Sequence, residues 1–189
     1  MSRDDSVPAL ILGALSEDDA PVLHGWRRDP IVRDGALGYP FPTSLEAERE
    51  WIRSFTPRGT PQDLCLAVRE AGELLGYCQL RSIDWIAGVA ELGIVIGASH
   101  ARGRGIGSLA LDMLIHYASR QLRLRRLWLR VVENNPAAIR LYESAGFQRE
   151  GRLPCHVHRD GQLLDLLIYG YELTGQSART STPAGSLER

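Results

Sequence analysis

The chain has 189 residues, a formal net charge of −1 and a hydrophobic fraction of 44%. This length suits one domain with a sizeable core, and the near-neutral charge offers no bulk attraction for nucleic acid. The sequence contains no lysine, so every basic side chain apart from histidine is a guanidinium. Cys65, Cys78 and Cys155 have no C-x-x-C spacing, so we expect thiols in a reducing compartment and no metal site.

The first residues have the composition of a flexible start rather than of a targeting signal. Residues 1–8 are polar, and no stretch of the sequence approaches the roughly 18 consecutive apolar residues of a membrane span. We therefore expect a cytoplasmic protein with no membrane partner. Residues 9–15 predict a first strand, and Ser16 and Asp19 have the spacing of a capping box. The helix that follows is expected to end near Asp29, because Pro30 disfavours the helical conformation in the residue before it.

Residues 31–43 predict an irregular segment, because two glycines and two prolines interrupt it. Tyr39 and Phe41 lie among these turn residues, where they either anchor the segment to the core or line a substrate mouth; anchoring is the favoured interpretation. Thr43 and Glu46 predict a capping box for a helix at residues 45–55. Strands at residues 63–70 and 74–82 then predict a hairpin around the Ala71-Gly72-Glu73 turn.

The centre of the sequence is a strand, a glycine-rich loop and a helix. Residues 91–96 are rich in β-branched side chains, and residues 102–108 contain three glycines and two arginines. The helix that follows has one apolar face, formed by Ile106, Leu109, Ala110, Met113, Leu114 and Tyr117. Unpaired N–H groups at a helix N-terminus, with glycines that allow close approach, suit a phosphate or pyrophosphate. An ordinary strand-to-helix turn is the alternative.

The glycine loop differs from two well-known phosphate loops. A Walker A loop has lysine before its Ser or Thr, whereas Ser108 follows Gly107 directly. A dinucleotide fingerprint has G-x-G-x-x-G spacing, whereas the glycines here are Gly103, Gly105 and Gly107. Nucleotide hydrolysis and dinucleotide redox chemistry are therefore disfavoured, and a phosphate-binding module for nucleotides is kept as an alternative.

A second strand and helix follow the central helix. Residues 125–133 predict a strand parallel to the central strand, because a helix connects the two. Residues 134–146 predict a helix with Pro136 in its first turn and Gly146 at its end, so that Asn135 stands at the helix start. Tyr142 lies on the same helical face as Ala138 and Leu141, and its alternative role is that of a core aromatic. A short strand at residues 147–152, a hairpin at residues 154–173 and a disordered tail at residues 175–189 complete the chain.

Two motifs give the sequence a specific resemblance. Residues 102–107 match R-x-x-G-x-G, and residues 135–147 match N-x-x-A-I-x-L-Y-x-x-x-G-F, so the chain resembles the GNAT family of N-acetyltransferases. The resemblance implies an α/β (α+β) single-domain fold at residues 9–174, with a mostly antiparallel mixed sheet that splays between a central parallel pair and is flanked by helices. The first strand, the segment around Tyr39 and Phe41, and the final hairpin with Arg159 and Asp165 resemble the branch of ribosomal-protein alanine and spermidine N-acetyltransferases.

The resemblance also implies a reaction and roles for individual residues. Acetyl-CoA would donate its acetyl group to a primary amine, either a protein N-terminus or a small molecule. The backbone near Val95 and Gly97 would bind the pantetheine arm and polarise the thioester carbonyl, Asn135 would also bind pantetheine, and Tyr142 would protonate the leaving thiolate. The pyrophosphate would be held by the main chain of Arg102, Gly103, Arg104, Gly105, Ile106, Gly107 and Ser108.

The base that deprotonates the amine is less defined by the sequence. Glu91 on the central strand is the first candidate, and its alternative role is that of a strand-surface carboxylate. Glu133 is the second, and His100, His156 and His158 are further candidates. The alternative function is that of a regulatory protein that binds acyl-CoA without transferring the acyl group. The presence of both Asn135 and Tyr142 argues against this alternative. Homodimerisation, common in the family, is a further expectation.

Overall fold

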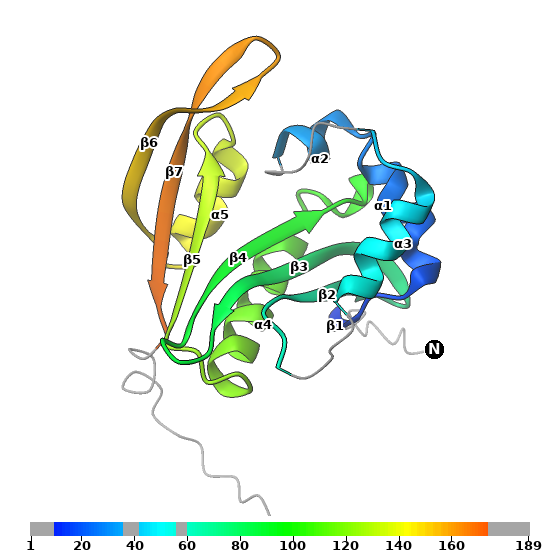
Figure 1. Ribbon diagram of the computed structural model, residues 1–189, viewed down its shortest axis with the longest axis horizontal. Helices are drawn as coiled ribbons and strands as arrows, with labels where there is room; N and C mark the ends of the chain where they lie inside the picture. The colour runs from blue at the N-terminus through cyan, green and yellow to red at the C-terminus, as the bar shows by residue number, and fades with distance from the viewer. Residues whose placement is uncertain (1–9, 36–41, 56–59, 174–189) are drawn as a thin grey trace, which may run out of the picture.

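The computed structural model describes residues 10–35, 42–55 and 60–173 (Figure 1). Within these residues one mixed sheet has the strand order β1-β2-β3-β4-β5-β7-β6. The expected flexible start at residues 1–8 and tail at residues 175–189 lie outside the described residues, as do Tyr39 and Phe41. The strands are β1 (Leu10–Ala14), β2 (Leu64–Glu70), β3 (Glu73–Asp84), β4 (Val89–Ile96), β5 (Arg126–Val132), β6 (Gln148–Arg159) and β7 (Gln162–Glu172).

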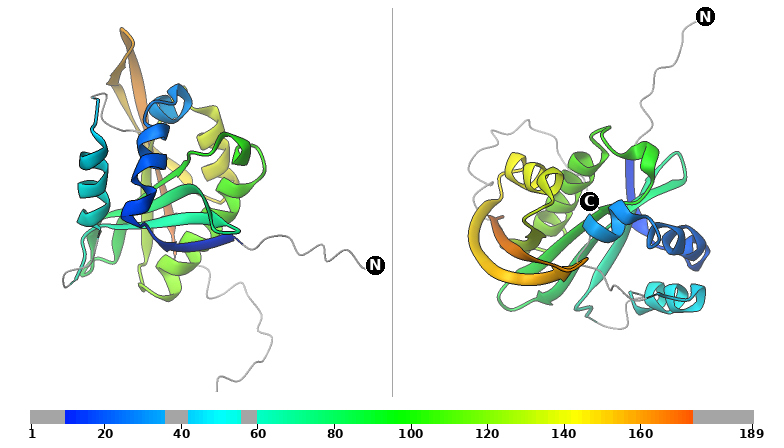
Figure 2. Two further views of the ribbon diagram at one scale, coloured as in Figure 1. Left: turned by 90° about the vertical axis from the view of Figure 1, so that its right-hand side faces the viewer. Right: turned by 90° about the horizontal axis from the view of Figure 1, so that it is seen from above.

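Helices cover both faces of this sheet. The helices are α1 (Ala20–Trp26), α2 (Pro30–Gly35), α3 (Leu45–Ser54), α4 (Ile106–Arg120) and α5 (Pro136–Ser144), with single 3-10 turns at Glu17–Asp19 and Ser99–Ala101. Figure 2 shows α1 and α3 on one face of the sheet and α4 and α5 on the other. The larger core lies under α4 and α5, where the buried leucines of α4 and Tyr142 of α5 join buried side chains of β3, β4 and β5. A smaller cluster lies beneath α1 and α3.

The sheet opens between β4 and β5. The two strands are parallel, as expected for a helical crossover, but they pair only where residues 89–91 meet residues 126–128. Beyond this point β4 follows β3 and β5 follows β7, so the two strands diverge (Figure 1). Backbone groups on the facing sides of both strands are thereby left without a strand neighbour. The predicted splayed sheet is confirmed, and the divergence creates room for ligands at the middle of the domain.

Two local predictions were wrong, both at helix starts. Residues 31–43 were expected to be irregular, yet Pro30 begins helix α2, and the Asp29 side chain accepts a hydrogen bond from the Ile31 amide at 2.9 Å. A proline ends a preceding helix but is also well suited to the first helical position, because its missing N–H would have no partner there. Ser44, not Thr43, caps α3, since its hydroxyl accepts from the Ala47 amide at 3.1 Å.

Gly97, directly after β4, allows a close contact that fixes helix α1. A Cβ atom at this position would overlap the Trp26 indole ring, which lies against the end of the strand. We expect Gly97→Ala to lower the free energy of unfolding by about 1–3 kcal/mol, because overpacking forces backbone or ring displacement. Gly25→Ala is the matched control, since a Cβ there meets no atom within 4 Å. Equal urea midpoints for the two variants would show that Trp26 moves aside at no cost.

Candidate active site

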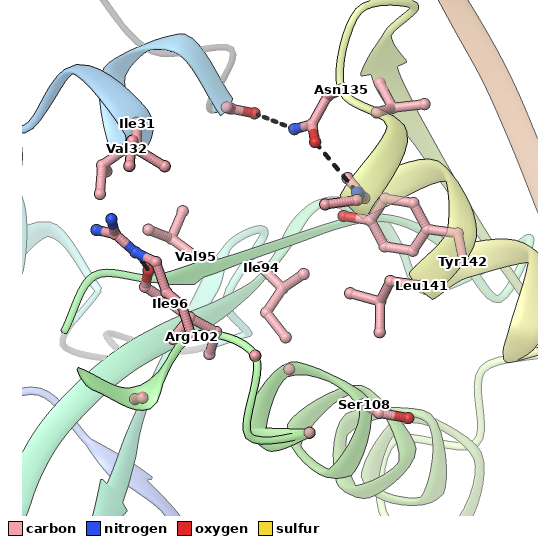
Figure 3. Close-up of a pocket in the computed structure, with 18 of the residues that line it drawn as sticks. Ile31, Val32, Ile94, Val95, Ile96, Arg102, Ser108, Asn135, Leu141 and Tyr142 are labelled. Carbon is pink, nitrogen blue, oxygen red and sulfur yellow. Dashed lines mark hydrogen bonds between the residues drawn. The ribbon is translucent and has the colours of Figure 1, made fainter. Parts of the chain in front are cut away.

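Two cavities open on the two sides of the splay between β4 and β5. The first, here called the loop cavity, has a volume of about 410 Å³ and lies between the loop before α4, helix α5 and helix α2 (Figure 3). The second, here called the aromatic cavity, has a volume of about 420 Å³ and lies below α1 and α3. Both are lined by Ile94 and Val95 of β4, Arg130 of β5, Tyr142 of α5 and Gly35 of α2. The cavities therefore meet at Tyr142.

The glycine loop presents bare backbone to the loop cavity. Gly103 and Gly105 have φ angles of 76° and 80°, a left-handed conformation that side chains disfavour. Gly105 is the N-cap of α4, so the first amides of that helix have no partner within it. Gly107 lines the cavity, and a Cβ there would meet only Ile96 and Leu141, at 3.7 Å. The helix N-terminus thus faces the cavity without an intervening side chain, as an anionic ligand requires.

The two arginines of the loop have different surroundings. The Arg102 guanidinium donates to the carbonyl oxygens of Ile96 at 3.2 Å and Gly97 at 2.7 Å, and forms an ion pair with Asp29 at 2.5 Å. Arg102 thereby fastens helix α2 to the end of β4 and closes one wall of the loop cavity. Arg104 instead pairs with Glu70 at 3.0 Å at the surface. Of the predicted loop residues, Arg104 and Ile106 do not line the cavity, and the Ile106 side chain is buried in the core.

The Asp29–Arg102 pair gives helix α2 a pH-dependent attachment. The hydrogen bond from Arg102 holds the pKa of Asp29 below its ordinary value of 3.8. A carboxyl with a lowered pKa in the folded state stabilises that state above its unfolded pKa, and this contribution is lost as the pH falls through the lowered value. We expect Asp29→Asn to lower the melting temperature at pH 7 and the difference from the wild type to shrink once the pH is below 3.8. Glu50→Gln, at an exposed position of α3, is the control. A pH-independent difference would assign the effect to something other than the charge of Asp29, because asparagine keeps the side-chain oxygen that accepts from the Ile31 amide.

The amides of β4 differ from the prediction in one respect. The Gly97 amide donates to the Leu75 carbonyl at 3.0 Å, so it is occupied by β3; the role of Gly97 in pantetheine binding stays a prediction, and this contact argues against it. Val95 pairs with Tyr77 in the same ladder, and residues two apart on an antiparallel strand point the same way. The Val95 amide therefore also faces β3. The amides of Ile94 and Ile96 face the open side of β4, where β5 has diverged.

Asn135 and Tyr142 come together on helix α5, as the second motif predicted. The Asn135 side chain accepts from the Ala138 amide at 3.1 Å and so caps the helix, while its amide nitrogen donates to the Gly35 carbonyl at 3.4 Å (Figure 3). It therefore bridges α5 and α2 across the loop cavity. Tyr142 is only 5% exposed, and its hydroxyl points from α5 toward the cavity. Burial raises the pKa of Tyr142, so its hydroxyl retains its proton at neutral pH.

Glu91, the first candidate for the general base, lies in a different environment from the one expected. Its side chain is buried and does not line either cavity. Arg130 donates to both carboxylate oxygens, at 2.8 and 3.2 Å, and Arg81 donates to one of them at 3.2 Å. The two guanidinium groups occupy the carboxylate oxygens on which a general base would take up a proton. The role of Glu91 as a base stays a prediction, and these contacts argue against it.

The other candidates for the base also lie away from the cavities. Glu133 accepts from the Asp165 amide at 2.9 Å, and His100 pairs with Glu73 at 3.4 Å on the surface. His156 and His158 are exposed on β6. None of these four residues lines the loop cavity or the aromatic cavity. The predicted site residues that do line the cavities come from the glycine loop, from β4 and from α5 with its N-cap: Arg102, Gly103, Gly105, Gly107, Ser108, Val95, Asn135 and Tyr142.

The aromatic cavity contains residues that the sequence did not single out. Trp51 and Phe55 of the α3 region and Tyr77 of β3 form one wall, with Trp51 ring centroids 4.9 Å from Phe55 and 5.5 Å from Tyr77. Three guanidinium groups and one carboxylate complete the charged lining: Arg27, Arg81, Arg130 and Asp63. Arg81 and Arg130 lie within largely apolar strands, where a charged side chain needs a partner or a ligand. An arginine within an apolar strand was therefore the sequence feature that could have identified Arg81 and Arg130 as cavity residues.

Comparison with known proteins agrees with this geometry. The model of the GNAT acetyltransferase domain matches residues 9–148 of the chain. The chain belongs to the GNAT acetyltransferase family. A Bacillus licheniformis protein named N-acetyltransferase p20 is 31% identical over 162 residues, which cover 85% of this chain and 90% of that protein. The predicted fold, acetyl transfer to an amine and acetyl-CoA as the cosubstrate are thereby confirmed.

Two further GNAT proteins, both from Vibrio cholerae, are similar over most of their length. A spermidine N(1)-acetyltransferase is 32% identical over 158 residues, which cover 83% of this chain and 89% of that protein. A solved structure of a spermidine N-acetyltransferase in complex with CoA and spermine has a TM-score of 0.80 and 25% identity, and the match covers 87% of this chain and 96% of that one. In the described part of this GNAT protein, no helix is long and apolar enough to cross a membrane.

Proposed function

We propose that this GNAT protein transfers the acetyl group of acetyl-CoA to the primary amine of a small molecule, with acetyl-CoA in the loop cavity and the amine in the aromatic cavity. The observation that carries the proposal is the meeting of the two cavities at Ile94, Val95 and Tyr142. Two substrates that enter from opposite sides of the splay would place their reacting atoms beside the same tyrosine. Holding the reactants in this way supplies much of the rate enhancement of a bimolecular transfer.

The residues of the loop cavity fit acetyl-CoA. The free amides at the start of α4 and the bare Cα of Gly107 suit the pyrophosphate, and the neighbouring wall is held in place by Arg102. The outward amides of Ile94 and Ile96 are placed to bind the pantetheine arm and to polarise the thioester carbonyl. The Asn135 amide, which bridges to Gly35, is a further donor at this cavity.

The chemistry assigned to Tyr142 is that of a general acid. The neutral amine nitrogen attacks the thioester carbonyl carbon, the carbon–sulfur bond breaks, and the departing thiolate takes the proton of the Tyr142 hydroxyl. The proton that the nitrogen releases as the amide forms then restores the Tyr142 hydroxyl. The buried, protonated hydroxyl at the junction of the cavities supports this role. Glu91 would act indirectly, because it holds Arg81 and Arg130 at the wall of the aromatic cavity.

Several expectations stay predictions. They are a protein N-terminus as the acceptor, a cytoplasmic location and homodimerisation. A similar structure, a spermidine N-acetyltransferase from Vibrio cholerae, is described as dodecameric, which makes self-association of this chain worth measuring. A regulatory acyl-CoA-binding role is the second candidate function, and it predicts binding without turnover.

The test is release of thiol from acetyl-CoA by the purified protein, with a panel of amino acids, polyamines, aminoglycosides and peptides with free N-termini. Turnover with one class is the expected result, and mass spectrometry of the product must show the added acetyl group. Tight binding of acetyl-CoA with no turnover on any amine would contradict acetyl transfer and favour the regulatory role. Absence of acetyl-CoA binding would contradict the assignment of the loop cavity.

A further inference from the structure

The charge of the aromatic cavity bears on which amine it accepts. Arg27, Arg81 and Arg130 line this cavity, and the carboxylate among its described lining residues is Asp63. Asp63 lies on the exposed rim and accepts a hydrogen bond from the Ser82 amide at 2.8 Å. A polycationic amine requires carboxylates along its length, because desolvated like charges repel. The lining instead presents guanidinium groups, which carboxylates pair from behind: Glu48 pairs with Arg27, and Glu91 pairs with both Arg81 and Arg130.

The carboxylates behind this wall leave one guanidinium incompletely paired. Glu91 is shared between Arg130, which contacts both of its oxygens, and Arg81, which contacts one. Among the described residues, the Arg81 Nε is a buried donor without a hydrogen-bond partner. Two guanidinium groups therefore share one carboxylate, and Arg81 has the larger unused capacity for hydrogen bonds. The Nε atom itself is shielded from solvent, so an anionic group on the ligand would meet the outer part of the Arg81 side chain, which is 35% exposed.

Arg130 would hold the anionic group of the ligand close to the reaction centre. It lines the aromatic cavity together with Arg81 and also lines the loop cavity beside Tyr142. An anionic group near Arg81 and Arg130 would therefore lie a few bonds from the attacking nitrogen. Guanidinium groups match carboxylates and phosphates particularly well, because their planar donors form paired hydrogen bonds.

The aromatic wall indicates what the rest of the acceptor is. Trp51 contacts both Phe55 and Tyr77 edge to face, and the three side chains line the cavity together. The Arg27 guanidinium already lies over the Trp51 ring, 5.5 Å from its centroid. That face of the indole is therefore not free to bind a cationic amine through its π electrons. The wall is better suited to an apolar side chain.

We propose that the acceptor is a primary amine that also carries an anionic group, as a free amino acid does, with the anion bound by Arg81 and Arg130. This inference rests on the proposed function, because it assigns the substrate of the same reaction. The amine would face Tyr142 and the thioester, and an apolar side chain would pack on Trp51, Phe55 and Tyr77. The arrangement favours a different acceptor from the spermidine for which one relative is named.

The test compares substrates that differ only in the anionic group. The ratio kcat/KM is measured for L-phenylalanine against L-phenylalaninamide, for phosphoethanolamine against ethanolamine, and for spermidine. We expect the anionic member of a pair to be favoured at least about 10-fold, the effect of a hydrogen bond between charged groups. The first pair reports a carboxylate and the second a phosphate. Equal values within both pairs, or a preference for spermidine, overturn this inference and leave acetyl transfer standing, whereas no turnover on any amine overturns both.

A variant assigns the preference to a residue. Arg81→Gln should reduce the ratio between the paired substrates toward one while the Kd for acetyl-CoA stays unchanged. Arg53→Gln is the matched control, because its guanidinium pairs with Glu17 and Glu46 on the surface and does not line the cavity. A full preference in Arg81→Gln would overturn the assignment to Arg81. The comparison of substrate pairs on the wild-type protein decides the inference even where the variant does not fold.

Discussion

Replacement of Tyr142 by phenylalanine should lower kcat by roughly 100-fold or more and leave the Kd for acetyl-CoA nearly unchanged. General acid catalysis typically contributes 10²–10⁴-fold, and the variant removes only the hydroxyl that supplies the proton. The ring stays in place, 5.8 Å from the Phe147 ring, so the helix should keep its packing. A loss confined to kcat identifies a group that acts in the transition state rather than in binding.

Tyr169→Phe is the matched control for this experiment. The Tyr169 hydroxyl donates to Glu143 at 2.9 Å on the far side of α5 and does not line either cavity. Its removal should lower the free energy of unfolding by about 0.5–1.5 kcal/mol with little effect on kcat. Steady-state kinetics and acetyl-CoA titration of both variants separate the two roles. Unchanged turnover in Tyr142→Phe would refute the general-acid assignment.

The second large effect is expected for Gly107→Asp. The new carboxylate would stand where the first turn of α4 meets the loop cavity, at the position assigned to the pyrophosphate. Two like charges about 4 Å apart in a partly buried setting repel by roughly 4 kcal/mol, and half of that raises Kd about 30-fold. The same charge favours the helix itself, since an acidic residue near a helix N-terminus stabilises it by about 0.3–1 kcal/mol.

Affinity and stability should therefore change in opposite directions, which a general folding defect cannot produce. Leu109→Asp is the control, because this residue lies on the same helix but is 49% exposed and does not line the cavity. Isothermal titration with acetyl-CoA, paired with thermal melting, measures both quantities. Equal acetyl-CoA affinities for the two variants would place the pyrophosphate elsewhere.

Local sequence patterns predicted the elements to which acetyl-CoA binding is assigned. Gly105 and Pro136 mark the starts of α4 and α5 through backbone preferences that act within a few residues, and the structure has both helices. Asp29–Pro30 was ambiguous, since the same dipeptide ends one helix and begins another. The capping residue of α3 was likewise ambiguous, because Thr43 and Ser44 are adjacent and equally suitable.

The features that the sequence did not reveal depend on contacts between distant segments. The register between β3 and β4 determines which amides of β4 face the splay. A shift of one residue would turn the Val95 amide toward the splay in place of the Ile94 amide. Arg27, Arg81 and Arg130 reach one cavity from three separate elements, so no local spacing connects them. The contacts of Glu91 also depend on distant segments, because the two guanidinium groups around it come from the neighbouring strands β3 and β5.

The central claim is that acetyl-CoA and the amine occupy adjoining cavities at the same time. A route through an acetylated cysteine would need a thiolate beside the thioester. Burial raises the pKa of the Cys78 thiol to about 12 and that of Cys65 far above its ordinary value, so both stay protonated at neutral pH. Cys155 is exposed and does not line either cavity, so direct transfer is the expected route.

Initial rates measured over a grid of acetyl-CoA and amine concentrations test this claim most directly. We predict intersecting double-reciprocal lines and no release of CoA in the absence of amine, because the acetyl group passes directly between the two substrates. Parallel lines, together with a stoichiometric burst of CoA before amine is added, would contradict the account, since they would require an acetylated protein between two separate half-reactions.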